Sequence, residues 1–173
     1  MRRWRGARRD GDISVGRGIY FATMFFGSLG VQRLSARFVC FIVRDSSYLD
    51  SLPLYRHLDL SYHSYRDCNI QNYVLAAEEL AERGYYVIRM GAKVKEAFNV
   101  KHPNIIDYAF NGMRSDFMDI YLGAKCTFCV TVGTGFDSIP FIFRRPIVDT
   151  NFVPLGFFST KTCNLAFPPS VAE

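Results

Sequence analysis

Short apolar runs and amphipathic segments alternate along most of the chain. The runs are rich in β-branched and aromatic residues, as is typical of strands buried on both faces, and they predict strands at 37–43, 85–88, 104–108, 126–132 and 147–150. Apolar residues at helical spacing predict helices at 67–83, 116–124 and 136–143. This alternation predicts an α/β fold with a Rossmann-like, mostly parallel sheet and flanking helices.

The ends of two predicted helices carry residues that helix ends favour. Asp67 can cap the first helix and Gly84 stands at its stop position, while Ser115 can cap the second, with Asp116 in its first turn. Residues 46–66 are rich in Tyr, Ser, Asp and His and read as a long loop. Loops of that length inside a compact domain are usually functional.

The length of 173 residues suits one domain, which we expect at 37–160. Residues 1–36 are expected to form a basic tail and an apolar linker, and residues 161–173 an irregular tail. The net charge of +5 is concentrated at the start, because residues 1–10 hold five arginines and one aspartate. The rest of the chain is nearly neutral, so bulk charge does not favour a nucleic-acid partner.

The apolar run 18–30 follows the basic tail in the order of a signal peptide. It is too short to span a bilayer, and we favour a segment that packs on the domain behind a solvated arginine tail. We expect a cytoplasmic protein. Peripheral contact of the tail with anionic lipid at the inner membrane face stays open.

Five scattered cysteines do not form a disulfide framework. Cys126 and Cys129 have the spacing of a redox or metal motif, but they fall in a predicted strand, where such positions point to opposite faces. A structural zinc site would need a second pair. We interpret these cysteines as core residues in a reducing compartment, with redox or metal use as the alternative, and we predict no metal site.

Parallel sheets bind ligands at the carboxyl ends of their strands, which selects three places in this sequence: Arg44-Asp45, Arg89-Met-Gly91 and Gly133–Ser138. In the third, Gly133 and Gly135 allow close approach of an anion, and Thr134 and Ser138 add hydroxyls. We predict a diphosphate cradle there, with a plain strand-to-helix turn as the alternative.

This glycine-rich segment nearly matches a dinucleotide-binding fingerprint, but it follows a late strand instead of the first, which disfavours an NAD enzyme. The chain also lacks the motif of P-loop nucleotidases.

Arg44 and Arg89 each end a predicted strand, and their guanidinium groups suit phosphate oxygens. The alternatives are ion pairs of Arg44 with Asp45 and of Arg89 with a carboxylate such as Asp107. Asp116 could bind sugar hydroxyls or orient an arginine, although the helix dipole alone would also explain it.

Several motifs in the same order resemble a family of bacterial glycosyltransferases of GT-B type, distantly similar to fucosyltransferases. The segments that carry the resemblance are 41–49, 61–73, 84–91, 106–109, 114–122, 133–137 and 143–148. GT-B enzymes have two Rossmann-like domains, and the chain looks like the C-terminal one, which binds the nucleotide-sugar donor. The resemblance implies an N-terminal acceptor domain that this chain lacks.

The resemblance implies sugar transfer from a nucleoside-diphosphate sugar to a glycan or surface-polysaccharide acceptor, with no metal and no cofactor besides the donor. Arg44 would stabilise the departing diphosphate and Asp45 is the best carboxylate for a catalytic base. Arg89, Gly91, Asp116 and the glycine-rich segment would bind the donor. Many members carry His where this chain has Ile42, which leaves a non-catalytic nucleotide- or sugar-binding remnant as the alternative. A basic-tailed membrane or nucleic-acid adaptor is a third reading.

Overall fold

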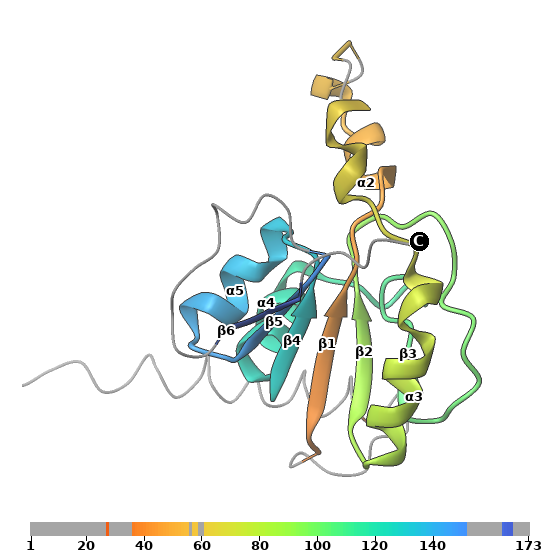
Figure 1. The fold of residues 1–173 in the computed structure, drawn as a ribbon, viewed down its shortest axis with the longest axis vertical. Helices are drawn as coiled ribbons and strands as arrows, with labels where there is room; N and C mark the ends of the chain where they lie inside the picture. The colour runs from red at the N-terminus through yellow and green to blue at the C-terminus, as the bar shows by residue number, and fades with distance from the viewer. Residues whose placement is uncertain (1–26, 28–35, 56, 59–60, 152–163, 168–173) are drawn as a thin grey trace, which may run out of the picture. The chain divides into compact units, whose positions relative to one another are not determined.

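Six strands form one sheet in the computed structural model, which describes residues 27, 36–55, 57–58, 61–151 and 164–167. The strand order is β3-β2-β1-β4-β5-β6, and every neighbouring pair is parallel (Figure 1). This is the order of doubly wound nucleotide-binding sheets. The predicted α/β, Rossmann-like fold is therefore confirmed.

The strands lie where the apolar runs predict them, with one addition. Their bounds are β1 Phe38–Ile42, β2 Tyr86–Met90, β3 Ile105–Ile106, β4 Phe128–Thr131, β5 Ile147–Thr150 and β6 Asn164–Phe167. All five residues of β1 are buried, because this central strand has neighbours on both sides and helices over both faces. The expectation of an irregular tail at 161–173 is wrong for β6, a short edge strand whose backbone pairs with β5.

Four α-helices and four 3-10 turns connect these strands in the described residues. The helices are α2 Ser47–Asp50, α3 Val74–Glu82, α4 Asp116–Lys125 and α5 Ser138–Ile142, and the turns are η1 Pro53–Tyr55, η2 Ser61–Arg66, η3 Ile70–Tyr73 and η4 Gly135–Asp137. The expectation of one long loop at 46–66 is thus wrong, because α2, η1 and η2 fall within it. Short turns of this kind satisfy backbone groups without a regular apolar pattern.

The predicted helix 67–83 begins later than its first residue. Asn69 caps it instead of Asp67, because the Asn69 side chain accepts a hydrogen bond from the Gln71 N–H at 2.7 Å. A 3-10 turn then leads into α3 at Val74. At the other end, Gly84 adopts φ +81°, the left-handed conformation that commonly follows a helix, as predicted.

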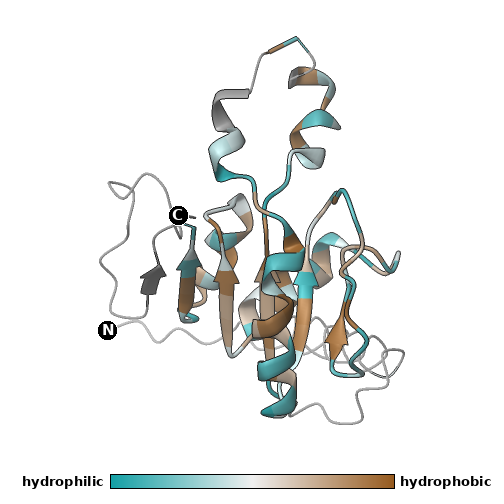
Figure 2. Ribbon diagram, turned by 45° about the vertical axis from the view of Figure 1, so that its right-hand side comes forward, coloured by the Kyte–Doolittle hydropathy of each residue, from teal (hydrophilic) through white to brown (hydrophobic). Residues whose placement is uncertain are grey.

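Helices cover both faces of the sheet. The β1–α3–β2 connection runs toward one edge, whereas the connections through α4 and α5 run toward the other. Because such crossovers are right-handed, α3 covers one face and α4 and α5 cover the opposite one. Val39 and Phe41 of β1 pack in one buried cluster with Ala77 of α3. Figure 2 shows that hydrophobic residues gather on the central strands between these layers.

The chain divides after Ala36, and the sheet belongs to the unit Arg37–Glu173. The expectations for the basic tail and for the apolar run 18–30 concern segments that, apart from Gly27, lie outside the described residues. Within the described part of the chain, no helix has both the length and the apolar character that a bilayer crossing requires.

Candidate functional site

The strand order reverses direction between β1 and β4, and this switch point lies at the carboxyl ends of the two strands. From β1 the chain crosses to β2 on one side, and from β4 it crosses to β5 on the other. Loops that leave two neighbouring strands in opposite directions separate, and doubly wound sheets bind their ligands at this switch point. The segments that begin at Val43 and Val132 border this switch point.

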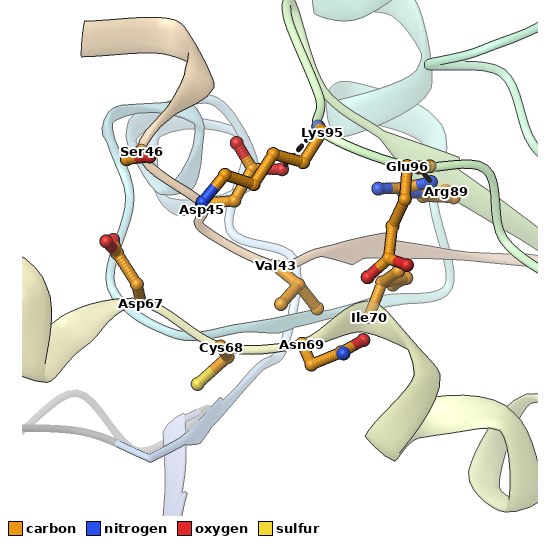
Figure 3. Close-up of a pocket in the computed structure, with 10 residues that line it drawn as sticks. All are labelled: Val43, Asp45, Ser46, Asp67, Cys68, Asn69, Ile70, Arg89, Lys95 and Glu96. Carbon is orange, nitrogen blue, oxygen red and sulfur yellow. Dashed lines mark hydrogen bonds between the residues drawn. The ribbon is translucent and has the colours of Figure 1, made fainter. Parts of the chain in front are cut away.

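A cavity of about 250 Å³ lies at the same edge, on the β1–β2 side (Figure 3). Residues from the ends of β1 and β2, from the start of η3 and from the loop after β2 line it: Val43, Asp45, Ser46, Asp67, Cys68, Asn69, Ile70, Arg89, Lys95 and Glu96. Its volume is below the roughly 300–1,000 Å³ of sites that enclose a drug-sized ligand. The cavity can therefore hold one ring or one compact group, not a whole nucleotide sugar.

Asp45 closes one wall of this cavity. One carboxylate oxygen accepts a hydrogen bond from the Ser47 N–H and the other from the Lys95 N–H, both at 2.9 Å. The first contact starts α2 and the second joins the end of β1 to the loop after β2. Both oxygens are thus engaged with backbone groups, an arrangement that suits a positioning residue.

Arg89 is buried in the cavity wall, with 2% of its side chain exposed. Its Nη1 donates to the Glu96 carbonyl at 2.6 Å and lies 3.2 Å from the Asp107 carboxylate. The alternative prediction, an ion pair with Asp107, is therefore the one that the structure contains. Nearby, Gly91 leaves room for Val94, whose Cγ1 would lie 2.7 Å from an added Cβ.

Arg44 follows β1 and pairs with Asp67, not with Asp45. Its Nε lies 3.2 Å from the Asp67 carboxylate, and 15% of its side chain is exposed. The Arg44 carbonyl also accepts the Cys68 N–H at 2.9 Å. These contacts hold the segment before η3 against the end of β1, beside the cavity.

The glycine-rich segment after β4 contains its own carboxylate. Asp137 accepts hydrogen bonds from the Thr134 N–H at 2.6 Å, from the Thr134 hydroxyl at 3.0 Å and from the Thr131 hydroxyl at 2.6 Å. Gly133 adopts φ +75°, which its turn requires. The Thr134 amide is therefore already used within the loop, and Asp137 is a residue that the sequence pattern did not single out.

Arg66 is a second residue that the sequence pattern did not reveal. It ends η2, and its Nη2 donates to the carbonyl of Gly133, 67 residues away in the sequence. Its Nε is buried and has no hydrogen-bond partner among the described residues. Only the fold brings this guanidinium to the switch point, so no local sequence signal could have found it.

A third feature without a sequence signal is the pair of carboxylates beneath this loop. Asp149 of β5 is 6% exposed and stands opposite Thr131 in the parallel register. Burial and the charge of Asp137 raise the pKa of Asp149 to about 6. Burial also raises the pKa of Asp137, although hydrogen bonds from Thr131 and Thr134 and the charge of Arg66 oppose the shift.

The remaining predicted residues lie outside the cavity lining. Asp116 is the first residue of α4 and pairs with Arg114 at 3.1 Å, with 93% of its side chain exposed. Gly135 and Ser138 are exposed at the starts of η4 and α5. The structure thus brings Asp45 and Arg89 together, while the glycine-rich segment lies across β1 from them.

The cysteines of the described segments are free thiols. Cys129 lies in β4, whereas Cys126 is the C-cap of α4 and not part of the strand that the sequence predicted for it. Both thiols are buried, which confirms their interpretation as core residues. No group of three potential metal ligands occurs within the described ranges.

Comparison with models of protein families, with curated proteins and with solved structures finds no match to this chain. The resemblance of its motifs to glycosyltransferases therefore stays a prediction.

Proposed function

We propose that this chain is the donor-binding domain of a glycosyltransferase that transfers a sugar from a nucleoside-diphosphate sugar to a glycan or surface-polysaccharide acceptor. The observation that carries the proposal is the cavity at the carboxyl edge of the sheet, beside the switch point. Rossmann-like sheets of this strand order bind nucleotides at that point. The motif resemblance favours sugar transfer over other nucleotide chemistry.

The donor would lie along the carboxyl ends of β2, β1 and β4. Neighbouring strands are about 4.8 Å apart, so β2 and β4 are separated by about 10 Å across β1. One end of the donor would occupy the cavity on the β1–β2 side. The other would reach the glycine-rich segment and Arg66 on the β1–β4 side.

In this arrangement, Arg66 stabilises the departing diphosphate, while Arg44, whose charge Asp67 balances, holds the segment before η3 against the end of β1. Bond breaking leaves negative charge on that group, and fixed guanidinium donors favour it more than they favour the intact donor. Arg66 has the buried Nε that lacks a partner among the described residues. Arg89, whose charge Asp107 balances, holds the cavity wall.

A second candidate function is donor binding without transfer. It is favoured by Asp45, the carboxylate predicted as catalytic base, because backbone amides engage both of its oxygens. In either case we propose a cytoplasmic domain, with the arginine-rich tail as its contact with an anionic membrane surface.

Thermal denaturation with a panel of UDP, GDP, ADP and CDP tests the proposal. A nucleotide at about 100-fold its Kd should raise the Tm by roughly 5–10 °C. Arg66→Ala should abolish that rise, whereas Arg83→Ala, which replaces an exposed arginine at the far end of α3, should retain it. A panel without any shift at millimolar concentration would refute the donor site.

Release of the free nucleoside diphosphate from a bound donor separates the two candidates. Transfer requires release that depends on an acceptor glycan, and binding alone predicts none.

A further inference from the structure

The charges around the cavity do not favour an anion. Asp107 balances Arg89, and Arg44 balances Asp67, so these four charges cancel in pairs. What is left in the lining is two carboxylates, Asp45 and Glu96, against the single ammonium of Lys95. A diphosphate would enter a cavity with excess negative charge and would be repelled.

The polar groups of the lining instead form a mixed set of donors and acceptors. Figure 3 shows the Glu96 carboxylate directed toward Ile70 and Asn69, while its backbone carbonyl serves Arg89. Asn69 uses its side-chain oxygen to cap η3, which leaves its amide NH₂ as a donor. The Lys95 side chain reaches over Asp45 from the opposite wall.

The cavity also has an apolar floor. Val43 and Ile70 are 8% and 3% exposed, and Figure 3 shows both between the polar walls. An apolar surface bordered by a few fixed polar groups matches a ring with a C–H face and hydroxyl groups at its edge. Hydroxyl groups can donate to Glu96 and accept from Asn69 and Lys95, whereas phosphate oxygens can only accept.

We propose that the cavity binds a neutral, hydroxyl-rich ring, a pyranose or a ribose, and that the Glu96 carboxylate accepts hydrogen bonds from its hydroxyl groups. This rests on the proposed function, of which it names the part of the donor held by the cavity. The phosphates then belong at the switch point on the other side of β1, near Arg66.

The substitution Glu96→Gln distinguishes a polyol site from an anion site by the sign of its effect. Loss of the charged acceptor weakens the binding of a hydroxyl group, whereas loss of a repelling charge strengthens the binding of an anion. The Glu96 side chain is exposed, and only its backbone carbonyl serves the core, so the variant should fold. Glu82→Gln, an exposed glutamate at the end of α3, is the matched control.

The experiment is an NMR titration of the full chain, which follows the backbone amides of residues 67–70 and 95–96. The probes are D-glucose, D-mannose and L-fucose for the pyranose, uridine and guanosine for the ribose, and pyrophosphate for the anion. We expect a neutral probe to shift these amides, with an affinity that falls at least threefold in Glu96→Gln and stays unchanged in Glu82→Gln. Monosaccharides and nucleosides in separate arms decide between pyranose and ribose.

Three results would overturn the inference: pyrophosphate alone shifts these amides, Glu96→Gln tightens binding, or no neutral probe binds. If nucleoside diphosphates raise the Tm while neutral probes fail here, the inference fails and the proposed function stands. If a neutral probe binds and no nucleotide does, the proposed function fails and the polyol site stands.

Discussion

The Asp45 carboxylate accepts a hydrogen bond from the backbone amide of Lys95, 50 residues later in the chain, at 2.9 Å. This contact joins the end of β1 to the loop after β2 and forms one wall of the cavity. The shape of the cavity therefore depends on Asp45, whose two carboxylate oxygens both accept backbone hydrogen bonds.

Asp45→Ala should loosen the loop that carries Lys95 and Glu96. We expect a loss of about 1 kcal/mol in the free energy of unfolding, because water can replace the acceptor at this exposed amide. Hydrogen exchange of the Lys95 amide should accelerate at least tenfold. Asp50→Ala, an exposed carboxylate on α2, is the control, and equal exchange rates in both variants would contradict the assignment.

Asp107→Ala should destabilise the protein more than Asp45→Ala does. It leaves the Arg89 guanidinium buried without its counter-charge and removes the acceptor of the Phe98 N–H, so we expect a loss of about 3–5 kcal/mol. Urea denaturation measures it. Glu79→Ala breaks the exposed pair with Arg83 and should cost less than about 1 kcal/mol. Similar losses in the two variants would contradict the prediction that the buried Arg89 guanidinium depends on Asp107 for its counter-charge.

Asp149→Asn should stabilise the protein at neutral pH. The folded-state pKa of Asp149, about 6, lies above its ordinary value, so the fold favours the protonated form. The folded state then binds more protons than the unfolded state between about pH 4 and 6, and stability falls as pH rises through that window. At pH 7.5 the variant should be more stable by about 1–3 kcal/mol, and at pH 4 the gain should vanish.

Denaturant unfolding at several pH values tests this, with Asp50→Asn as the reference for general charge effects. The negative charge of Asp137 contributes to the raised pKa of Asp149, after burial, so the protonation state of Asp137 affects the midpoint. A gain that does not depend on pH would contradict the prediction.

Substitutions of Gly123 and Gly135 distinguish a glycine that helix packing requires from one that only the approach of a ligand would require. A Cβ on Gly123 would lie 2.7 Å from Ile139 Cγ2, so Gly123→Ala should push α4 from α5 and cost about 1–3 kcal/mol. A Cβ on Gly135 would meet nothing within 4 Å, so Gly135→Ala should leave the Tm unchanged. If a diphosphate approaches this loop, Gly135→Ala should still weaken nucleotide binding, and unchanged binding would remove Gly135 from the site.

The sheet was predictable because its strands have a strong local signal. The run around β1 is apolar at every position, and each of its residues is buried as that pattern indicates. Edge strand β6 gave no such signal, because a four-residue edge strand is defined by pairing with β5 more than by its own composition. The helical turns within 46–66 escaped prediction because side-chain contacts with the backbone, such as Asp45 with the Ser47 N–H, build them without any apolar periodicity.

The candidate site divides in the same way. The strand ends were predictable as the location of the candidate site, because a parallel sheet gathers them at one edge. The ion pair of Arg89 with Asp107 was also among the alternatives that the sequence offered. Arg66 was not, because its contact with Gly133 spans 67 residues and follows no spacing rule. The carboxylate pair of Asp137 and Asp149 depends likewise on strand register.

The sequence by itself thus determined the α/β class and the strands, because the periodicity of apolar residues is a local property of the chain. Only the tertiary structure decided which charges neutralise each other. Arg89 meets Asp107, Arg44 meets Asp67 and Asp45 meets the Lys95 amide because strand order and register bring distant segments together. Those pairings leave the cavity without excess positive charge, and for that reason we propose a hydroxyl-rich ring there instead of the diphosphate that its arginines suggested.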